Sequence, residues 1–239
     1  MLRIEHLVKT YGGRRAVDDL SLHIAPGEIY GFIGHNGAGK TTTLKAVCGV
    51  IEFDGGEIYI AGKSVKKEPL ECKRRTAFIP DNPDLYDFLS GIKYLNFIAD
   101  VYGVSAEDRR ERIRKYADIF ELSSDLAQSI SAYSHGMKQK LALISAFIHD
   151  PDFLVFDEPF VGLDPKASRT MKDLMREKCD HGGAVFFSTH ILEVAEKLCD
   201  KVAIIKDGRL VASGGMDEIR GDSSLEELFF ELDEDDEWE

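Results

Sequence analysis

The sequence is poor in the features that mark secreted, metal-binding and membrane-spanning chains. Its 239 residues include four cysteines, and none of them forms a CxxC pair or stands at another metal-ligand spacing. Such cysteines favour a reducing, cytosolic compartment over a disulfide framework. The N-terminal MLRIEHLVKT lacks the apolar core of a signal peptide. The longest apolar run, LALISAFI at 141–148, falls far short of the roughly 20 residues that span a bilayer. We therefore expect a chain that cannot cross a membrane alone, although it can dock on a protein that does.

Positive charge is scarce as well. The chain has 30 Lys and Arg against 43 Asp and Glu, which gives a net charge of −13. Duplex binding rests on cationic contacts with phosphates, so no nucleic-acid partner is expected. Much of the acidic excess lies in LDEDDEWE at 232–239, and we expect 221–239 to form an acidic C-terminal tail. Such a run is typical of a solvated or disordered tail, with an interaction segment as the alternative.

A glycine-rich loop is the most informative motif that the sequence does contain. Residues 34–41 read GHNGAGKT and match G-x-x-x-x-G-K-[ST] at every fixed position, between a strand-like segment and a helix start. Glycines let backbone N–H groups converge on phosphate oxygens, and the helix N-terminus behind them adds a positive dipole end. Lys40 suits the β- and γ-phosphates of a nucleotide, and Thr41 suits a magnesium ion. The alternative is a glycine-rich turn without a ligand.

The order of apolar patterns predicts the fold. Alternating segments open the chain, helical spacing runs from about residue 85 to 150, and continuous apolar runs at 152–159 and 183–190 indicate strands buried on both faces. A hairpin is expected around Asp207-Gly208. We predict an α/β fold: a P-loop NTPase core with a mostly parallel sheet, an antiparallel β edge and a helical insertion subdomain at about 85–150, all in one domain over 1–220. The expected helix starts are Ser90, Ser105 and Ser134.

Two acids follow the apolar run at 152–159. In FLVFDEP, Asp157 can hold a water-bound magnesium ion beside the phosphate loop, and Glu158 can orient or deprotonate a water that attacks the γ-phosphate. Open α/β sheets bind ligands at the carboxyl ends of their strands, which favours this interpretation over a strand cap or a surface acid pair. His190 ends the run at 183–190 in the same way, either as a structural histidine or as a contact to the γ-phosphate.

A third motif precedes an amphipathic helix. Ser134, His135 and Gly136 stand at the start of the helical pattern in AYSHGMKQKLAL. A serine caps a helix, and a free helix N-terminus also attracts anions. Composition and spacing leave both roles open.

The ordered set of motifs resembles the ATP-binding-cassette (ABC) ATPases, the motor subunits of ABC transporters, over about residues 1–220. Walker A alone would be shared with many kinases and GTPases, whereas the whole set is typical of this family. The matching segments are GHNGAGKTT (34–42) for the Walker A loop, AFIPDNP (77–83) for the entry to the Q-loop, YSHGMKQ (133–139) for the signature motif, FLVFDEP (153–159) for Walker B, GLDP (162–165) for the D-loop and STH (188–190) for the switch histidine.

The resemblance implies ATP and Mg²⁺ as cofactors. It also implies a head-to-tail homodimer, or a dimer with a closely related cassette, in which Ser134 and Gly136 of one chain cap the γ-phosphate held by the other. Asp164 would couple the two sites, and hydrolysis would let the dimer open. The implied catalytic residues are Glu158, His190 and Asp81, and the implied metal ligands are Thr41, Asp157 and Asp81. The residues implied to contact nucleotide are Tyr11, Val17, Gly34, His35, Asn36, Gly37, Ala38, Gly39, Lys40, Thr41, Thr42, Ser134, His135 and Gly136.

Three positions depart from the commonest pattern of the family. Asp81 stands where the Q-loop glutamine is usual, and its shorter, charged side chain would reach magnesium through a water. His135 replaces a glycine of the signature motif, and Met137 replaces a glutamine. Gly136 remains at the point of closest approach, so we expect the contact between chains to be kept.

Within the family, the resemblance favours the nucleotide-binding subunit of a bacterial exporter of the multidrug, bacteriocin-immunity or Ecs-like type. Such a subunit would lie at the cytoplasmic face of the cell membrane, as a peripheral partner of separate transmembrane permease subunits. Candidate permease contacts are Leu85, Tyr86, Phe88 and Leu89, unless these residues pack within the insertion's own core. The alternatives are a soluble ABC ATPase that acts on ribosomes or other macromolecules, and a small-molecule kinase, which leaves YSHGMKQ and STH unexplained.

Overall fold

The larger of two sheets forms the centre of the protein. The structure is a computed structural model that describes residues 1–221 and 223–234. Within this part of the chain the sheet has the strand order β10-β9-β3-β8-β7-β6, and only the β10–β9 pair is antiparallel. The mostly parallel sheet with an antiparallel edge is therefore confirmed. Its strands are β3 (Ile29–Ile33), β6 (Thr76–Ile79), β7 (Phe153–Asp157), β8 (Ala184–Thr189), β9 (Lys201–Lys206) and β10 (Arg209–Gly215).

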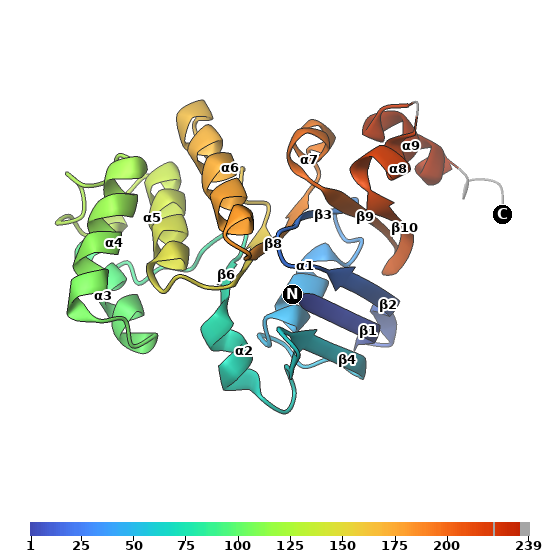
Figure 1. Cartoon of the computed structure of the whole chain (residues 1–239), viewed down its shortest axis with the longest axis horizontal. Coiled ribbons are helices and arrows are strands. Elements are labelled where there is room, and N and C mark those ends of the chain that lie inside the picture. The colour runs from blue at the N-terminus through green and yellow to red at the C-terminus, as the bar shows by residue number, and fades with distance from the viewer. Residues whose placement is uncertain (222, 235–239) are drawn as a thin grey trace.

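A smaller antiparallel sheet packs beside the central one (Figure 1). Its order is β2-β1-β4-β5, made of β1 (Leu2–Tyr11), β2 (Arg14–Ile24), β4 (Gly55–Ile60) and β5 (Lys63–Ser64). The chain passes from β2 to β3 through a turn at Gly27, whose φ is 87°. The two strands nevertheless belong to different sheets, because the turn redirects the chain rather than forming a hairpin.

Alternating residues of the central strands fill two separate cores. Every residue of β3, β7 and β8 is buried. Ile33, Phe156 and Phe187 pack in one cluster with the helices, whereas Phe32 and Phe186 pack in a second cluster toward the smaller sheet. Burying each such side chain contributes about 1.5–3 kcal/mol. The continuous apolar runs of the sequence therefore mark strands that are covered on both faces, as predicted.

The helical insertion lies to one side of the sheet (Figure 1). It contains α3 (Gly91–Val101), α4 (Ala106–Ile119) and α5 (His135–Ile148). Ser105 and Ser134 begin helices as predicted, since their hydroxyls accept from the N–H groups of Asp108 (3.1 Å) and Met137 (3.3 Å). Ser90 takes the N-cap position of α3 without a side-chain hydrogen bond.

The other helices surround the sheet, and the last of them lies in the C-terminal segment that the sequence predicted to be a tail. They are α1 (Lys40–Val47), α2 (Pro69–Arg75), α6 (Pro165–Asp180), α7 (Leu192–Leu198), α8 (Met216–Arg220) and α9 (Leu225–Glu234). The part of 221–239 that we expected as a solvated tail thus contains a helix, anchored by Leu225, which is fully buried. The rest of the acidic run, residues 235–239, lies outside the described residues.

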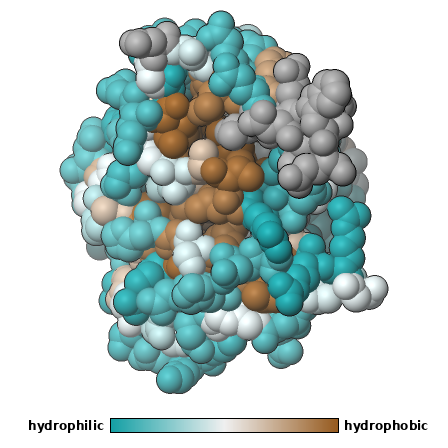
Figure 2. All heavy atoms as spheres, turned by 90° about the vertical axis from the view of Figure 1, so that its right-hand side faces the viewer, coloured by the Kyte–Doolittle hydropathy of each residue, from teal (hydrophilic) through white to brown (hydrophobic). Residues whose placement is uncertain are grey.

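Helix length and surface polarity bear on membrane contact. Within residues 1–221 and 223–234, none of the helices combines the length and apolarity that a bilayer crossing requires. Figure 2 shows the face that carries α8, α9 and the β10 edge, where apolar residues gather in a band between hydrophilic borders. The large apolar side chains of these elements that are most exposed are Val211 and Phe230.

Candidate phosphate-binding site

The candidate site lies where four parallel strands end. The chain leaves β3 into the loop 34–39, β6 toward Asp81, β7 at Asp157 and Glu158, and β8 at His190. Because parallel strands of one sheet share a carboxyl edge, their following residues meet there, although they are far apart in the sequence. The sheet register therefore assembles the motifs that the sequence shows only in order.

Glycine is required in the loop for two different reasons. A Cβ at Gly34 would lie 2.4 Å from the Ile205 carbonyl oxygen, so β9 leaves no room for a side chain. Gly39 has a φ of 109° and a Cβ there would lie 2.4 Å from the Ala16 carbonyl oxygen. Gly37 has a φ of 88° with open space around it. Close packing at Gly34 and Gly39 and the left-handed backbone at Gly37 and Gly39 fix the shape of the loop. A loop of this shape can direct its N–H groups at a phosphate.

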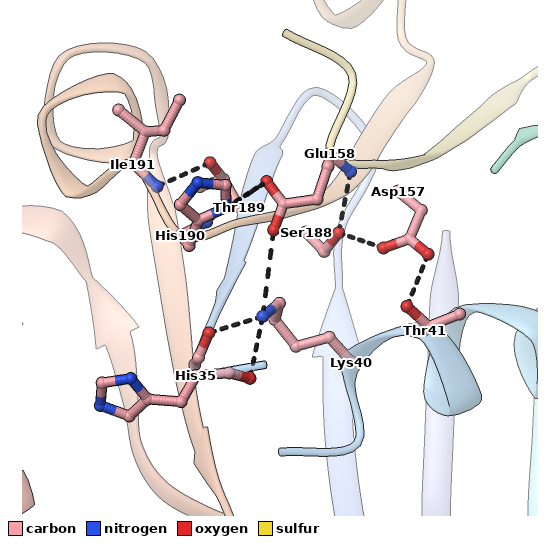
Figure 3. Close-up of polar contacts among 10 residues, drawn as sticks. His35, Lys40, Thr41, Asp157, Glu158, Ser188, Thr189, His190 and Ile191 are labelled. Carbon is pink, nitrogen blue, oxygen red and sulfur yellow. Dashed lines mark hydrogen bonds and ion pairs between the residues drawn. The ribbon is translucent and has the colours of Figure 1, made fainter. Parts of the chain in front are cut away.

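Lys40 begins α1 and is folded back over the loop. Its Nζ donates to the carbonyl oxygens of Gly34 (2.5 Å) and His35 (3.1 Å) and lies 3.9 Å from Glu158 Oε1. Burial lowers the pKa of this ammonium, and the carboxylates of Glu158 and Asp157 oppose that shift. Figure 3 shows the lysine between the loop and Glu158, and the ring of His35 turned away from it. His35 thus supports Lys40 through its backbone.

A buried carboxylate joins the loop to the strands. Asp157 is 2 % exposed and accepts from Thr41 Oγ1 at 2.6 Å and from Ser188 Oγ at 2.5 Å. Ser188 Oγ also accepts from the Glu158 N–H at 3.0 Å. Two hydroxyls from α1 and β8 therefore hold Asp157 in one orientation, facing the start of α1 (Figure 3).

Glu158 and His190 contact each other at the mouth of the site. The Nδ1 of His190 lies 3.0 Å from Glu158 Oε2, and the His190 N–H donates to the same oxygen at 3.4 Å. Glu158 has a φ of 50°, a backbone region that non-glycine residues visit rarely and that recurs at functional positions. Its side chain is thereby placed between Lys40 and His190 (Figure 3).

Lys40, Asp157 and Glu158 line a hollow of about 190 Å³. Asp81 lines it together with Asp157 and Glu158, so three carboxylates face the phosphate loop and its single lysine. The complete lining is Ala16, His35, Asn36, Gly37, Gly39, Lys40, Thr41, Thr42, Asp81, Asp157 and Glu158.

Several residues named from the resemblance lie outside this lining, and among them His190 reaches the hollow only through its contact with Glu158. Tyr11 ends β1 with half of its surface exposed, and Lys9 Nζ lies 5.0 Å from its ring centroid. Val17 is fully buried in the second core cluster, so its side chain offers no surface to a ligand in this structure, and its contact with nucleotide stays a prediction. Gly34 and Ala38 shape the loop from behind, with Ala38 buried.

The signature residues also lie apart from the hollow, next to the D-loop. Ser134 and His135 are exposed at the start of α5 and do not line the hollow. A Cβ at Gly162 would lie 2.8 Å from the His135 ring, and a Cβ at Gly136 would lie 3.2 Å from the Gly162 carbonyl oxygen. One chain therefore presents the signature residues and the phosphate loop as two separate surfaces.

An ion pair reinforces the contact between α5 and the D-loop. Lys140 Nζ lies 2.8 Å from Asp164 Oδ2, and Asp164 Oδ1 accepts from the Ala167 N–H at 2.8 Å, which caps α6. The hydrogen bond from Lys140, followed by that from Ala167, holds the pKa of Asp164 below its ordinary value. Asp164 is thus tied within its own chain to the helix that begins at the signature residues.

Sequence patterns missed two residues of the site. Ala16 lines the hollow from the third residue of β2, where its carbonyl leaves no room for a side chain at Gly39. Ser188 orients Asp157 and supports the backbone of Glu158. An alanine carries no chemical signal, and the role of Ser188 depends on the β7–β8 pairing of Asp157 with Ser188.

The packing of the loop predicts unequal effects of two similar substitutions. Gly39→Ala should lower the free energy of unfolding by about 3–5 kcal/mol, because it adds a clash with a backbone carbonyl to the cost of a positive φ. Gly37→Ala is the matched control and should cost about 1–2 kcal/mol, since only the backbone strain applies. Urea unfolding of both variants measures the difference. Equal losses would contradict the packing argument.

Comparison with known proteins agrees with this geometry. The sequence model of the family described as "ABC transporter" matches residues 17–161. The chain is 33% identical to the ABC-type transporter ATP-binding protein EcsA of Bacillus subtilis over 99% of this chain and 98% of that protein. It is 38% identical to the uncharacterized ABC transporter ATP-binding protein YhcH of the same species, over 88% and 68% of the two chains. It is 34% identical to the Nod factor export ATP-binding protein I of Paraburkholderia xenovorans, over 89% and 70%.

Solved structures show the same fold. An ATP-binding subunit of an ABC transporter superposes with a TM-score of 0.94 at 35% identity, covering 98% of this chain and 100% of the other. The ATP-binding cassette MJ0796, a dimer bound to ADP and Pi, gives a TM-score of 0.82 at 22% identity over 90% and 99% of the chains. The chain therefore belongs to the ABC transporter family, as an ATP-binding subunit that carries the family's ATPase domain.

Proposed function

We propose that this chain binds and hydrolyses ATP as one half of a head-to-tail dimer, and that the dimer drives separate permease subunits at the cytoplasmic face of the membrane. The observation that carries this proposal is the separation of the two halves of the site. The phosphate loop, Asp157 and Glu158 line one hollow, whereas Ser134 and Gly136 lie elsewhere on the surface. A second copy of the chain can bring the two surfaces together.

Phosphate binding rests on the loop and on Lys40. The N–H groups of the loop and of the first turn of α1 are donors for phosphate oxygens, and the helix dipole favours the anion. The Lys40 ammonium lies above the same loop, held by two carbonyl oxygens. A γ-phosphate offers it a charged acceptor in place of those neutral ones, which strengthens its hydrogen bonds.

The residues at the metal position suit Mg²⁺. The Thr41 hydroxyl and the Asp157 carboxylate already contact each other, and Asp81 lines the same hollow. Mg²⁺ takes oxygen ligands, uses one or two carboxylates and keeps several waters, so this donor set fits it. Within the described residues no group of three or more His, Cys, Asp or Glu side chains forms a metal cage, which agrees with an ion shared with phosphates. The ion would neutralise charge on the β- and γ-phosphates.

Hydrolysis would depend on Glu158 and His190. The Glu158 carboxylate lies at the mouth of the hollow, where it can orient a water toward the γ-phosphate and accept its proton. His190 contacts the same carboxylate and can hydrogen-bond a phosphate oxygen with its ring. Both groups are positioned by strand ends rather than by flexible loops, which favours in-line geometry.

The partner chain would complete the site. The Ser134 hydroxyl and the N-terminus of α5 are exposed and can approach a γ-phosphate held by the other chain. His135 stands beside them and adds a third polar group to that surface. Within one chain, Lys140 pairs with Asp164 of the D-loop, which follows Glu158. The surface that would cap the partner's phosphate is thereby linked to the segment that carries this chain's own Glu158.

An exposed aromatic cluster is the candidate permease contact. Tyr86 contacts the rings of Phe88, Tyr94 and Phe97 at centroid distances of 5.9, 6.2 and 5.7 Å. Phe88 is 82 % exposed and Tyr86 is 46 % exposed, whereas Leu85 is buried in the core. Of the candidate permease contacts, Leu85 therefore packs inside the insertion, whereas Tyr86 and Phe88 face outward. Exposed aromatic groups of this kind are typical of protein interfaces.

Export is the favoured direction of transport. The named relatives include a Nod factor export protein and EcsA, whose whole length aligns with this chain. The alternative is an ABC ATPase that acts on ribosomes or other macromolecules without a permease. Its test is co-sedimentation with ribosomes.

Dimer formation is the direct test of the composite site. Glu158→Gln should slow hydrolysis and trap an ATP-bound dimer, which size exclusion with ATP and Mg²⁺ detects. The double variant Glu158→Gln, Ser134→Arg should remain monomeric, because the larger side chain blocks the capping surface. Binding of ATP to the isolated double variant is the control for an intact phosphate loop. A double variant that dimerises as readily as Glu158→Gln would contradict the proposed contact.

Asp81, the third carboxylate of the hollow, predicts that ATP affinity depends strongly on the presence of Mg²⁺. Asp81→Asn removes one negative charge beside the triphosphate, so binding of ATP in EDTA should tighten about 3- to 10-fold. Asp84→Asn is the matched control, since Asp84 is exposed and does not line the hollow. Calorimetry with and without Mg²⁺ measures both. Equal affinities of the two variants in EDTA would exclude an electrostatic role of Asp81.

The aromatic cluster predicts a separable defect. Tyr86→Asp should reduce copurification with the permease at least fivefold, because a charge replaces the ring that contacts three others. ATP binding should stay unchanged, since Tyr86 does not line the phosphate hollow. Leu70→Asp, at an exposed apolar residue of α2, is the control. Copurification that is equal for the two variants would argue against this docking surface.

A further inference from the structure

The C-terminal helix α9 is packed against the core but contributes no residue to the phosphate-binding hollow. Ser224 and Glu227 cap it reciprocally: the Ser224 N–H donates to Glu227 Oε2 at 3.0 Å, and the Glu227 N–H donates to Ser224 Oγ at 3.1 Å. Such a capping box fixes where a helix begins. Leu225 then lies fully buried in the main core cluster, with Leu228 and Phe229 packed against it.

The same helix contacts the phosphate loop. The rings of Phe229 and His35 lie 4.8 Å apart between centroids, with an interplanar angle of 51°. His35 is the second residue of the loop, and its carbonyl oxygen accepts from Lys40 Nζ and from the Ala38 N–H at 3.2 Å. The ring of His35 therefore faces Phe229 of α9. Figure 3 shows its carbonyl oxygen directed at the lysine and its ring turned away. The contact between the His35 ring and Phe229 therefore restrains the His35 carbonyl oxygen that accepts from Lys40.

A second contact of α9 reaches the opposite wall of the site. The helix packs against α7, which begins two residues after His190, and Leu192, Val194 and Leu198 of α7 belong to the same cluster as Leu228 and Phe229. Figure 1 shows α8 and α9 at one end of the molecule, with α7 between them and α6. One helix thus touches both the phosphate loop and the element that follows His190.

We infer that Phe229 is a positioning residue for nucleotide binding, and that α9 holds the phosphate loop and the His190 segment in a fixed relation through the Phe229–His35 contact. The composition of α9 excludes a direct role with phosphate. Its described first turns carry Glu226, Glu227 and Glu231, and these carboxylates would repel a triphosphate. The helix acts through His35 instead. This inference rests on the ATP binding of the proposed function.

Adjacent phenylalanines supply the experiment and its control. Phe229→Ala should weaken binding of a non-hydrolysable ATP analogue with Mg²⁺ about 2- to 10-fold, the range of an aromatic pair contact. Phe230→Ala should stay within about twofold of the wild type, because Phe230 is 54 % exposed and its ring contacts Phe229 rather than the loop. Calorimetry measures both affinities. In turnover assays, the KM for ATP should rise for Phe229→Ala while kcat changes less than about twofold.

Further variants separate positioning from simple destabilisation. Phe229→Leu keeps the buried apolar contact but removes the ring, so it should fold normally and still weaken binding. Phe229→Tyr should restore the wild-type affinity. In a His35→Ala background, Phe229→Ala should add less than a twofold effect, because the contact is already lost. Hydrogen exchange at residues 34–40 should increase in Phe229→Ala and stay unchanged in Phe230→Ala.

The opposite results are equally definite. Affinity equal to or tighter than wild type in Phe229→Leu and Phe229→Ala would overturn the inference, and so would equal weakening by Phe229→Ala and Phe230→Ala. Absence of ATP-analogue binding by the wild-type chain itself would instead contradict the proposed function. The two failures are therefore distinguishable in one set of titrations.

Discussion

The buried carboxylate of Asp157 is the interaction on which the arrangement of the site depends. It accepts one hydroxyl from the first turn of α1 and another from β8, and is almost without solvent. A buried carboxylate is tolerated only when its lone pairs are used, so both hydroxyls are needed. Because Ser188 also supports Glu158, a single network sets the loop, the metal position and the proposed base. Displacement of either α1 or β8 would remove one of the two hydroxyls that this buried charge needs.

The charge balance of the hollow follows from that network. Lys40 is the cation that faces three carboxylates there, and burial lowers its pKa while its acidic neighbours oppose the shift. A triphosphate would add further negative charge, and the divalent cation of the proposed function would offset it. Asp81 increases this demand where the family commonly has an uncharged glutamine. The departure from the family pattern is therefore electrostatic, and leaves the backbone frame intact.

Two segments far from the chemistry connect to it by packing. Lys140 and Asp164 join the helix that begins at the signature residues to the D-loop that follows Glu158. The surface that we propose for capping a partner's phosphate is thereby tied to the segment that carries this chain's proposed base. The C-terminal helix reaches the phosphate loop from the other side through Phe229 and His35. Packed side chains transmit such restraints because interiors are dense and deform little. The acidic composition of the C-terminal segment alone gave no sign of this contact.

The sequence by itself determined the elements whose signals are local. GHNGAGKT, the apolar runs that became β7 and β8, and the caps at Ser105 and Ser134 could all be predicted, because glycine spacing, burial on two faces and N-capping act within a few residues. Tertiary structure decided what depends on strand register and long-range packing. The pairing of Asp157 with Ser188, the burial of Val17 and the entry of Ala16 into the site are of this kind. So is the folding of Leu225–Glu234 into a helix against the core, where one buried leucine and a capping box outweighed a composition typical of solvated chain.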